Sequence, residues 1–186
     1  MHSLHQHINE LVHLNDEEFA YVLEHFTPLR KRKYQYLVQE GEPTRREYWV
    51  VKGCLKSSYL DEKGKEHVLS FSMENWWVTD YKAFIHQTTA EVNVDCLEDC
   101  ELLAITYENR EKLTSEMHKM ERFWAKKTKF GYAALQGRIL SLLRDSAAER
   151  YDLLLNTYPQ LAQRVSKKLI ASYLGVTRET LSRLGS

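Results

Sequence analysis

The sequence predicts an α+β protein in which a β-roll comes first, a long helix follows, and a helix-turn-helix of the winged-helix type comes last. Three patterns support this fold class. Short alternating apolar runs between turn signals fill residues 31–107, as in sandwiches and rolls. Apolar residues at helical spacing follow from residue 113. Two short amphipathic segments then flank a glycine turn in residues 166–184.

Length and composition narrow the class of protein. With 186 residues and 26 basic against 26 acidic side chains, the chain is long enough for one large or two modest domains. We expect an effector domain at 1–110, a dimerisation helix and hinge at 111–136, and a DNA-binding domain at 137–186. No run of eighteen apolar residues suggests a membrane span, and the N-terminus does not resemble a secretory signal. Three cysteines imply no disulfide framework, so we expect a cytoplasmic protein.

The first part of the chain begins with helical periodicity and then changes to strands. Residues 4–26 are predicted to be helical, with Asn15 as an N-cap and Pro28 as the end. Strands are expected in the segments KYQYLVQ, YWVVKG, LKSSYLD, HVLSFSM, AEVNVDCL and CELLAIT. Residues 61–66 are predicted to form a hairpin turn in which Gly64 adopts positive φ.

A seam of regular 4-3-4-3 spacing marks the long helix. It consists of Leu113, Met117, Met120, Trp124, Lys127, Gly131 and Ala134. This is the heptad pattern of a coiled coil, so the preferred interpretation is self-pairing into a homodimer. The alternative is that the helix lies on the β-roll of its own protomer. Gly137 is a plausible hinge before a second helix that stops at Pro159.

The C-terminal segment has the layout of a helix-turn-helix. A first helix at about 167–174 is followed by Gly175 at the turn and by Thr177 as the N-cap of a second helix. Leu181 and Leu184 are expected to face inward. The alternative is a generic helical hairpin with a solvated face. The segment from Leu161 onward is basic, since only Glu179 opposes Arg164, Lys167, Lys168, Arg178 and Arg183.

These residues carry a resemblance to a known family. The stretch GVTRETLSRL resembles the recognition region of the Crp/Fnr transcription regulators, and ENWWVTDY and IASYLGVTRETLSR look most like their compact Bacteroidetes-type branch. The helix, the roll with GEP and YWVVKG, the long helix, the GRIL hinge and the helix-turn-helix stand in that family's order. The resemblance implies a cyclic-nucleotide-binding-like jelly roll, a dimer on near-palindromic double-stranded DNA, and RNA polymerase as a further partner.

The family's DNA contacts can be carried over residue by residue. Arg178, Glu179 and Arg183 match its base-reading positions, where Arg can bond guanine and Glu can accept from cytosine. Phosphate contacts are expected from Thr177, Ser182, Lys167 and Lys168. The sequence ends two residues after Leu184, earlier than the family's recognition helix, so we expect reduced DNA affinity.

The cyclic nucleotide cassette of the family is altered here. Asp80 stands about where the family has a ribose-binding Glu. Thr88 or Thr89 stands where the family has a phosphate-binding Arg. No Arg lies between Arg46 and Arg110, so we expect that cyclic AMP is not bound in the usual way. Candidates for the pocket of an unknown small effector are Trp76, Trp77, Asp80, Tyr81, Thr88 and Thr89. The aromatic members are alternatively core residues.

The sequence offers little for other classes of function. No catalytic motif is present, so the chain is predicted not to be an enzyme. Cys96 and Cys100 lack further ligands at zinc spacing and are expected to be small buried apolar groups, and no metal or cofactor is predicted. The competing hypothesis is a ligand-binding or interaction protein of cyclic-nucleotide-domain type with a vestigial DNA-binding end.

Overall fold

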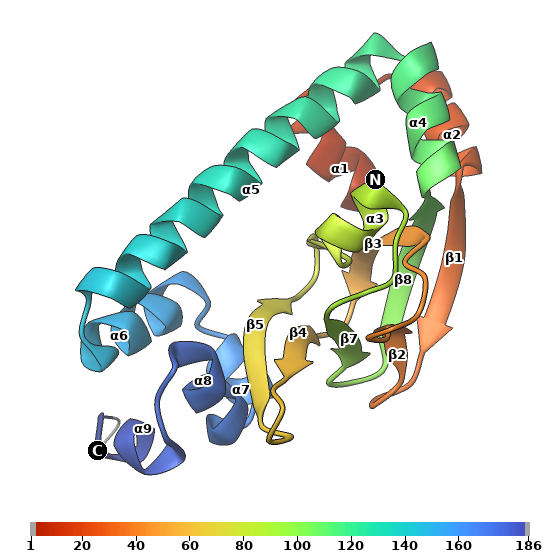
Figure 1. Cartoon of the computed structure of the whole chain (residues 1–186). Coiled ribbons are helices and arrows are strands. Elements are labelled where there is room, and N and C mark those ends of the chain that lie inside the picture. Colours follow the sequence, from red (N-terminus) through yellow and green to blue (C-terminus); the bar gives the residue numbers. More distant parts are fainter. Residues whose placement is uncertain (1–2, 185–186) are drawn as a thin grey trace. The chain divides into compact units, whose positions relative to one another are not determined.

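The computed structural model describes residues 3–184, and Figure 1 shows their helices and strands. The predicted α+β class is confirmed. The elements are α1 (Ser3–Asn9), α2 (Asp16–Glu24), β1 (Phe26–Lys31), β2 (Tyr36–Val38), β3 (Arg46–Lys52), β4 (Leu55–Leu60), β5 (Glu66–Ser72), β6 (Trp77–Val78), α3 (Tyr81–His86), β7 (Asn93–Cys96), β8 (Cys100–Thr106), α4 (Tyr107–Glu116), α5 (His118–Arg144), α6 (Ala147–Thr157), α7 (Leu161–Arg164), α8 (Lys167–Leu174) and α9 (Arg178–Leu184).

The chain forms two compact units. The first contains Met1–Ser57 and Phe71–Lys129, and the second contains Ser58–Ser70 and Phe130–Ser186. Helix α5 contributes to both, since its first half belongs to the first unit and its second half to the second. The three-part division at residues 110 and 136 stays a prediction.

The N-terminal segment departs from the single helix predicted for residues 4–26. Helix α1 ends at Asn9, and α2 starts after Asn15, whose side chain accepts a hydrogen bond from the Glu18 N–H in a capping box. The cap at Asn15 is therefore confirmed. Strand β1 begins at Phe26 and includes Pro28, so that proline lies in a strand instead of ending a helix.

The β-roll consists of two four-stranded sheets, with strand orders β1-β8-β3-β6 and β2-β7-β4-β5. Strand β8 pairs antiparallel with β1 and β3. Its side chains alternate: Leu102 and Ala104 enter the core between the sheets, whereas Leu103 and Ile105 face the helices. The hairpin turn at residues 61–66 is confirmed, with Gly64 at φ +74°.

A second apolar cluster covers the other face of the β1-β8-β3-β6 sheet. Helices α1, α2, α4 and α5 supply most of it, and Trp49 of β3 lies at its centre with no exposed surface. Figure 1 shows α2 beside α4, where Tyr21 donates to Glu116 although the two residues are 95 positions apart in the sequence. His7 packs in this cluster 4.5 Å from Trp49, and its burial, together with the nearby Lys127, lowers the pKa of His7 to about 4.

This cluster corrects the predicted dimerisation seam. Leu113 and Met120 have no exposed surface and Trp124 is 5% exposed, because all three pack in the core of their own protomer. Met117 is partly buried against the same core. The seam is also not one helix, since α4 ends at Glu116 and Met117 has extended φ and ψ. The alternative that this part of the helix lies on its own β-roll is thus correct, and of the seam only Gly131 and Ala134 are exposed.

The remaining helices form the core of the second unit. Helix α5 continues through Gly137 to Arg144, so the predicted hinge lies within a helix, and the break comes at Ser146, which caps α6. The small core consists of Leu154, Leu161, Val165, Ile170, Ala171, Leu174 and Leu181. Ser172 of α8 joins this core to strand β5: its hydroxyl donates to the Glu66 carbonyl and accepts from the Val68 N–H, at 2.9 and 3.0 Å.

Candidate nucleic-acid interface and effector domain

Helices α8 and α9 form the predicted helix-turn-helix. The hydroxyl of Ser166 accepts from the Leu169 N–H at the start of α8. Gly175 ends the helix at φ +71°, a left-handed conformation that favours glycine. Thr177 then accepts from the Thr180 N–H, as an N-cap of α9 does. Buried Ala171 and Leu181 pack α8 and α9 together within the core of this unit.

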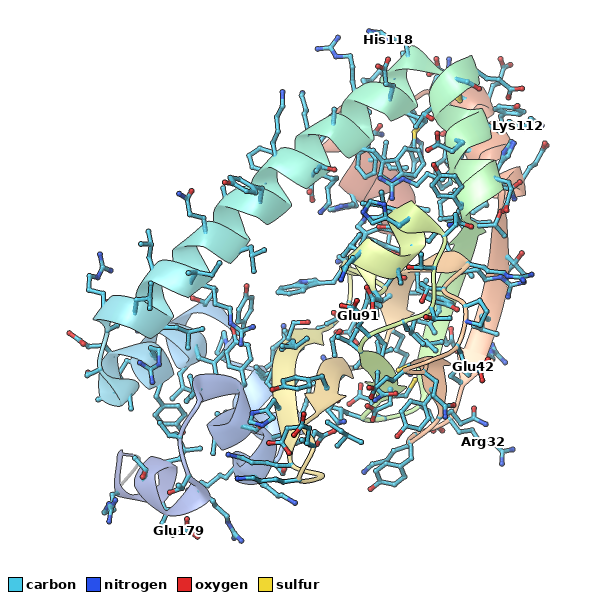
Figure 2. All side chains as sticks on the ribbon, viewed as in Figure 1. Arg32, Glu42, Glu91, Lys112, His118 and Glu179 are labelled. Carbon is cyan, nitrogen blue, oxygen red and sulfur yellow. The ribbon has the colours of Figure 1, made fainter. Side chains whose placement is uncertain are left out.

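The predicted base-reading side chains are all on α9. Arg178, Glu179 and Arg183 are exposed, and Figure 2 shows Glu179 extending away from α8. The helix N-terminus and the Thr177 hydroxyl lower the pKa of Glu179, which is therefore an anionic acceptor. The side chain of Leu184, predicted to face inward, lies outside the described residues.

The predicted phosphate contacts divide into two kinds. Lys167, Lys168 and Ser182 are exposed, the lysines in the first turn of α8 and the serine on α9. Thr177 is also exposed, but its hydroxyl accepts the capping hydrogen bond of α9 and interacts with the Glu179 carboxylate, so a phosphate would have to compete for it. Their role in DNA binding stays a prediction.

The six candidate residues of the effector pocket do not line one cavity. Asp80 is 6% exposed and caps α3, since its carboxylate accepts from the N–H groups of Ala83 and Glu91. Trp77 packs against the helix-covered core, 5.3 Å from Trp49 between ring centres. Trp76 is half-buried. The alternative for these aromatics, a core role, is thus observed for Trp77.

Thr88 and Thr89 line a cavity that the sequence did not predict. Its volume is about 400 Å³, and its other walls are Pro43, Thr44, Arg45, Gln87 and Glu108. The 43–45 segment reaches this place because Pro43 pairs with Thr89 and the Thr44 N–H donates to the Thr88 carbonyl. The Thr44 hydroxyl is buried without a hydrogen-bond partner, and Arg45 is exposed. The only sequence signal was the turn residue Pro43.

A buried ion pair lies next to α3. The guanidinium of Arg110 on α4 donates to the carboxylate of Glu47 on β3 at 2.9 Å, and Glu47 is 3% exposed. Arg110 also lies over the rings of Phe84 and Trp124, at 5.6 and 5.2 Å. Burial raises the pKa of Glu47, and Arg110 opposes that shift.

Tyr81, another pocket candidate, belongs to this network. Its ring is 45% exposed, whereas its hydroxyl donates to Glu47, and burial followed by the Glu47 charge raises its pKa. Arg110 and Glu47 therefore connect strand β3 and the start of α3 to α4 and α5. Sequence reasoning missed this network because the two partners are 63 residues apart.

The remaining candidates have structural surroundings. Cys54, Cys96 and Cys100 are buried and not joined by a disulfide, and the hydrogen bond that the Cys96 thiol donates to the Cys100 side chain, together with burial, raises the pKa of Cys96. Among residues 3–184, no group of three His, Cys, Asp or Glu side chains could hold a metal ion. No helix in the described part of the chain has the length and apolar character to span a membrane.

Comparisons with known proteins match this architecture. The cyclic nucleotide-binding domain family matches residues 28–116. The cAMP-activated global transcriptional regulator CRP of Salmonella typhimurium is 24% identical over 161 residues, which cover 80% of this chain and 75% of the relative. The structure of FixK2 from Bradyrhizobium japonicum has a TM-score of 0.73 at 24% identity, covering 86% of this chain and 82% of FixK2. A Crp/Fnr family regulator from Eubacterium rectale has a TM-score of 0.70 at 15% identity, covering 92% and 82%.

The fold and the matches define a class: a regulator with a cyclic nucleotide-binding domain followed by a helix-turn-helix. The chain is similar to the Crp/Fnr transcription regulators in sequence and in fold, and residues 28–116 match the cyclic nucleotide-binding domain. These matches agree with the family resemblance inferred from the sequence.

Proposed function

We propose that this chain is a cytoplasmic regulator, not an enzyme, that binds double-stranded DNA as a homodimer and acts on transcription through RNA polymerase. One observation carries the proposal: α9 presents Arg178, Glu179 and Arg183 to solvent, on a helix fixed by Gly175 and the Thr177 cap. Such a short exposed helix fits the major groove, where these side-chain types can read guanine and cytosine.

An exposed apolar stripe on α5 supports the homodimer. Tyr132, Leu135 and Ile139 recur at three- and four-residue spacing and are between 50% and 69% exposed. They differ from the seam predicted from sequence, which is largely buried. A stripe of this spacing suits a helix that pairs with its copy, and a two-fold dimer matches a near-palindromic DNA site.

The roll is proposed to sense a small effector other than cyclic AMP. The cavity bordered by Thr88 and Thr89 offers hydroxyl groups, the exposed Arg45 and the carboxylate of Glu108. A cyclic phosphate favours a bidentate guanidinium deep in its pocket, whereas an exposed arginine beside a carboxylate favours a polar ligand that also carries a donor.

Sequence reading by α9 is tested by two substitutions. Arg178→Ala is expected to weaken specific binding by about 1–3 kcal/mol and to relax preference at one base position in each half-site. Lys168→Ala is expected to weaken all sequences alike and to make the salt dependence shallower by about one unit. Both side chains are exposed, so neither change should affect folding. Selection of sites from random DNA compares the two variants with the wild type.

The difference between Arg178→Ala and Lys168→Ala decides whether α9 reads the DNA sequence. Half-sites about 34 Å apart, one helical turn, are expected from the wild-type dimer. If Arg178→Ala selects the same sites with unchanged sharpness, α9 does not read sequence, and a basic surface that binds DNA without selectivity explains the data instead.

Cyclic AMP is expected to bind weakly or not at all. Its phosphate would meet Thr88 and Thr89 where relatives are expected to supply a guanidinium, and loss of such a charge-assisted contact is worth about 1.5–3 kcal/mol. Isothermal titration of the full chain measures the affinity. A dissociation constant in the micromolar range or tighter would contradict this prediction.

A further inference from the structure

A second cavity lies within the helical unit. Its volume is about 250 Å³, and it is bordered by the second half of α5, by α6 and by the end of α8. Much of its wall is apolar, supplied by Ala134, Leu142, Leu153, Leu154 and Leu174. Leu142 and Leu153 are themselves 44% and 55% exposed, so an apolar surface remains open to solvent here.

Two guanidinium groups border the same cavity. Arg138 lies 3.8 Å from the centre of the Tyr173 ring and donates to the Tyr173 carbonyl at 3.3 Å. Arg150 donates to the carbonyls of Asp145 and Leu174, at 2.5 and 3.0 Å. The Nε–H of Arg150 is buried and has no hydrogen-bond partner.

The charge of this pair is not neutralised within the lining. Within the described part of the chain, the hydrogen bonds of both guanidiniums go to neutral carbonyl oxygens. Among the described residues that line the cavity, none carries a carboxylate. The carboxylate of the nearby Asp145 lies outside this lining, where it accepts from Arg144 at 2.8 Å, and the charge of Arg150 also lowers its pKa. Partly buried cations with neutral partners favour the binding of an anion. Burial also lowers the pKa of Arg138, because it disfavours the charged form of the side chain.

From the cavity, its leucines and the two guanidiniums, we propose that this site binds a small amphipathic organic anion. Its acidic group, a carboxylate or sulfonate, pairs with Arg138 and Arg150, and its aromatic or aliphatic body covers the exposed leucines. Arginine suits such a group because its planar fork makes two parallel hydrogen bonds. An inorganic anion would leave the apolar wall uncovered, so the apolar body is part of the recognition.

The site would also communicate with the helix-turn-helix, and this step rests on the proposed function. Tyr173 and Leu174 are the last residues of α8, directly before the turn at Gly175. Their carbonyls are held by the two guanidiniums that the anion would engage. A ligand that competes for these donors changes the support of the turn, so anion binding and DNA binding are coupled reciprocally.

The binding claim is tested without DNA. Anilinonaphthalene sulfonate, a fluorescent aromatic anion, is titrated into the full chain and compared with phenylnaphthylamine, which lacks the sulfonate. We expect the anion to bind at one site per chain, at least about tenfold tighter than the neutral compound. Equal affinity for both compounds would show that the guanidiniums play no part and would overturn the proposal.

Two glycines of α5 provide a matched pair of variants. Gly137 lines the cavity and Gly131 does not, and a Cβ added at either meets no atom within 4 Å. Gly137→Leu should therefore fold, since leucine favours a helix more than glycine does. It should fill part of the cavity and weaken the dye at least about tenfold, whereas Gly131→Leu should leave binding unchanged. Unchanged binding by Gly137→Leu, or equal losses in both variants, would place the dye elsewhere and overturn the site.

The two proposals fail separately. DNA site selection without any dye reports on α9 alone, whereas dye binding without DNA reports on the cavity alone. Addition of the dye to the DNA complex then measures the coupling, and the wild type should shift its DNA affinity more than Gly137→Leu does. If dye binds at the cavity but leaves DNA affinity unchanged, the communication step is wrong while the site stands.

Discussion

Arg110→Ala is expected to lower the free energy of unfolding by about 3–5 kcal/mol, because it leaves the Glu47 carboxylate buried without its cation. Glu47 is 3% exposed and lies 2.9 Å from the guanidinium of Arg110. The substitution also removes the contacts of Arg110 with Phe84 and Trp124. Urea unfolding followed by tryptophan fluorescence measures the change, which is a large fraction of the stability of a typical domain.

Two comparisons separate the buried charge from other effects. Arg30→Ala breaks an exposed ion pair with Glu101, at 3.5 Å, and should change stability by no more than about 1 kcal/mol. Adding Glu47→Gln to Arg110→Ala should restore part of the loss, since no charge then remains buried. A loss from Arg110→Ala no larger than that from Arg30→Ala would contradict the proposed role of the pair.

The pH dependence of the variant provides an independent check. Burial raises the pKa of Glu47 and Arg110 opposes this, so removing Arg110 should raise the pKa further. A carboxyl group whose folded pKa exceeds its unfolded value binds protons more readily in the folded state, so its protonation stabilises the fold. The loss in free energy of unfolding caused by Arg110→Ala should therefore become smaller as the pH falls below neutrality and larger as the pH rises.

The sequence predicted the helix-turn-helix well because its determinants are local. Ser166, Gly175 and Thr177 cap or turn the chain within three residues of the groups they satisfy. The effector side was predicted less well because its groups meet over long distances. Thr44 and Arg45 join Thr88 and Thr89 through strand pairing, and Glu47 joins Arg110 through packing, neither of which has a local signal. Asp80 was predicted as an effector-pocket residue, and in the structure its side chain caps α3.

The dimerisation seam shows a different limit of sequence patterns. Regular apolar spacing tells which face of a helix is covered but not what covers it. Met120 and Trp124 have the spacing of a coiled coil, yet helices α1 and α2, about a hundred residues earlier, complete the core around them. Farther along α5 the apolar residues keep a similar spacing, but there the structure leaves Leu135 and Ile139 exposed.

A matched pair of substitutions on α5 tests which surface forms the dimer. Met120→Glu places a charge at a position with no exposed surface, so it should destabilise the fold by roughly 3–5 kcal/mol. Leu135→Glu places the same charge at a position that is 58% exposed, so it should leave the folded protomer intact and separate the dimer into monomers. Circular dichroism during urea unfolding reports the first effect, and sedimentation velocity reports the second.

The two outcomes are opposite in kind, and this makes the comparison decisive. If the sequence seam were the interface, Met120→Glu would give stable, folded monomers and Leu135→Glu would have little effect on either measurement. With the exposed stripe as the interface, Met120→Glu loses structure, whereas Leu135→Glu sediments as a folded monomer and binds palindromic DNA more weakly, since each half-site must then be bound independently. A wild type that sediments as a monomer at the concentrations used for DNA binding would remove the homodimer from the proposed function.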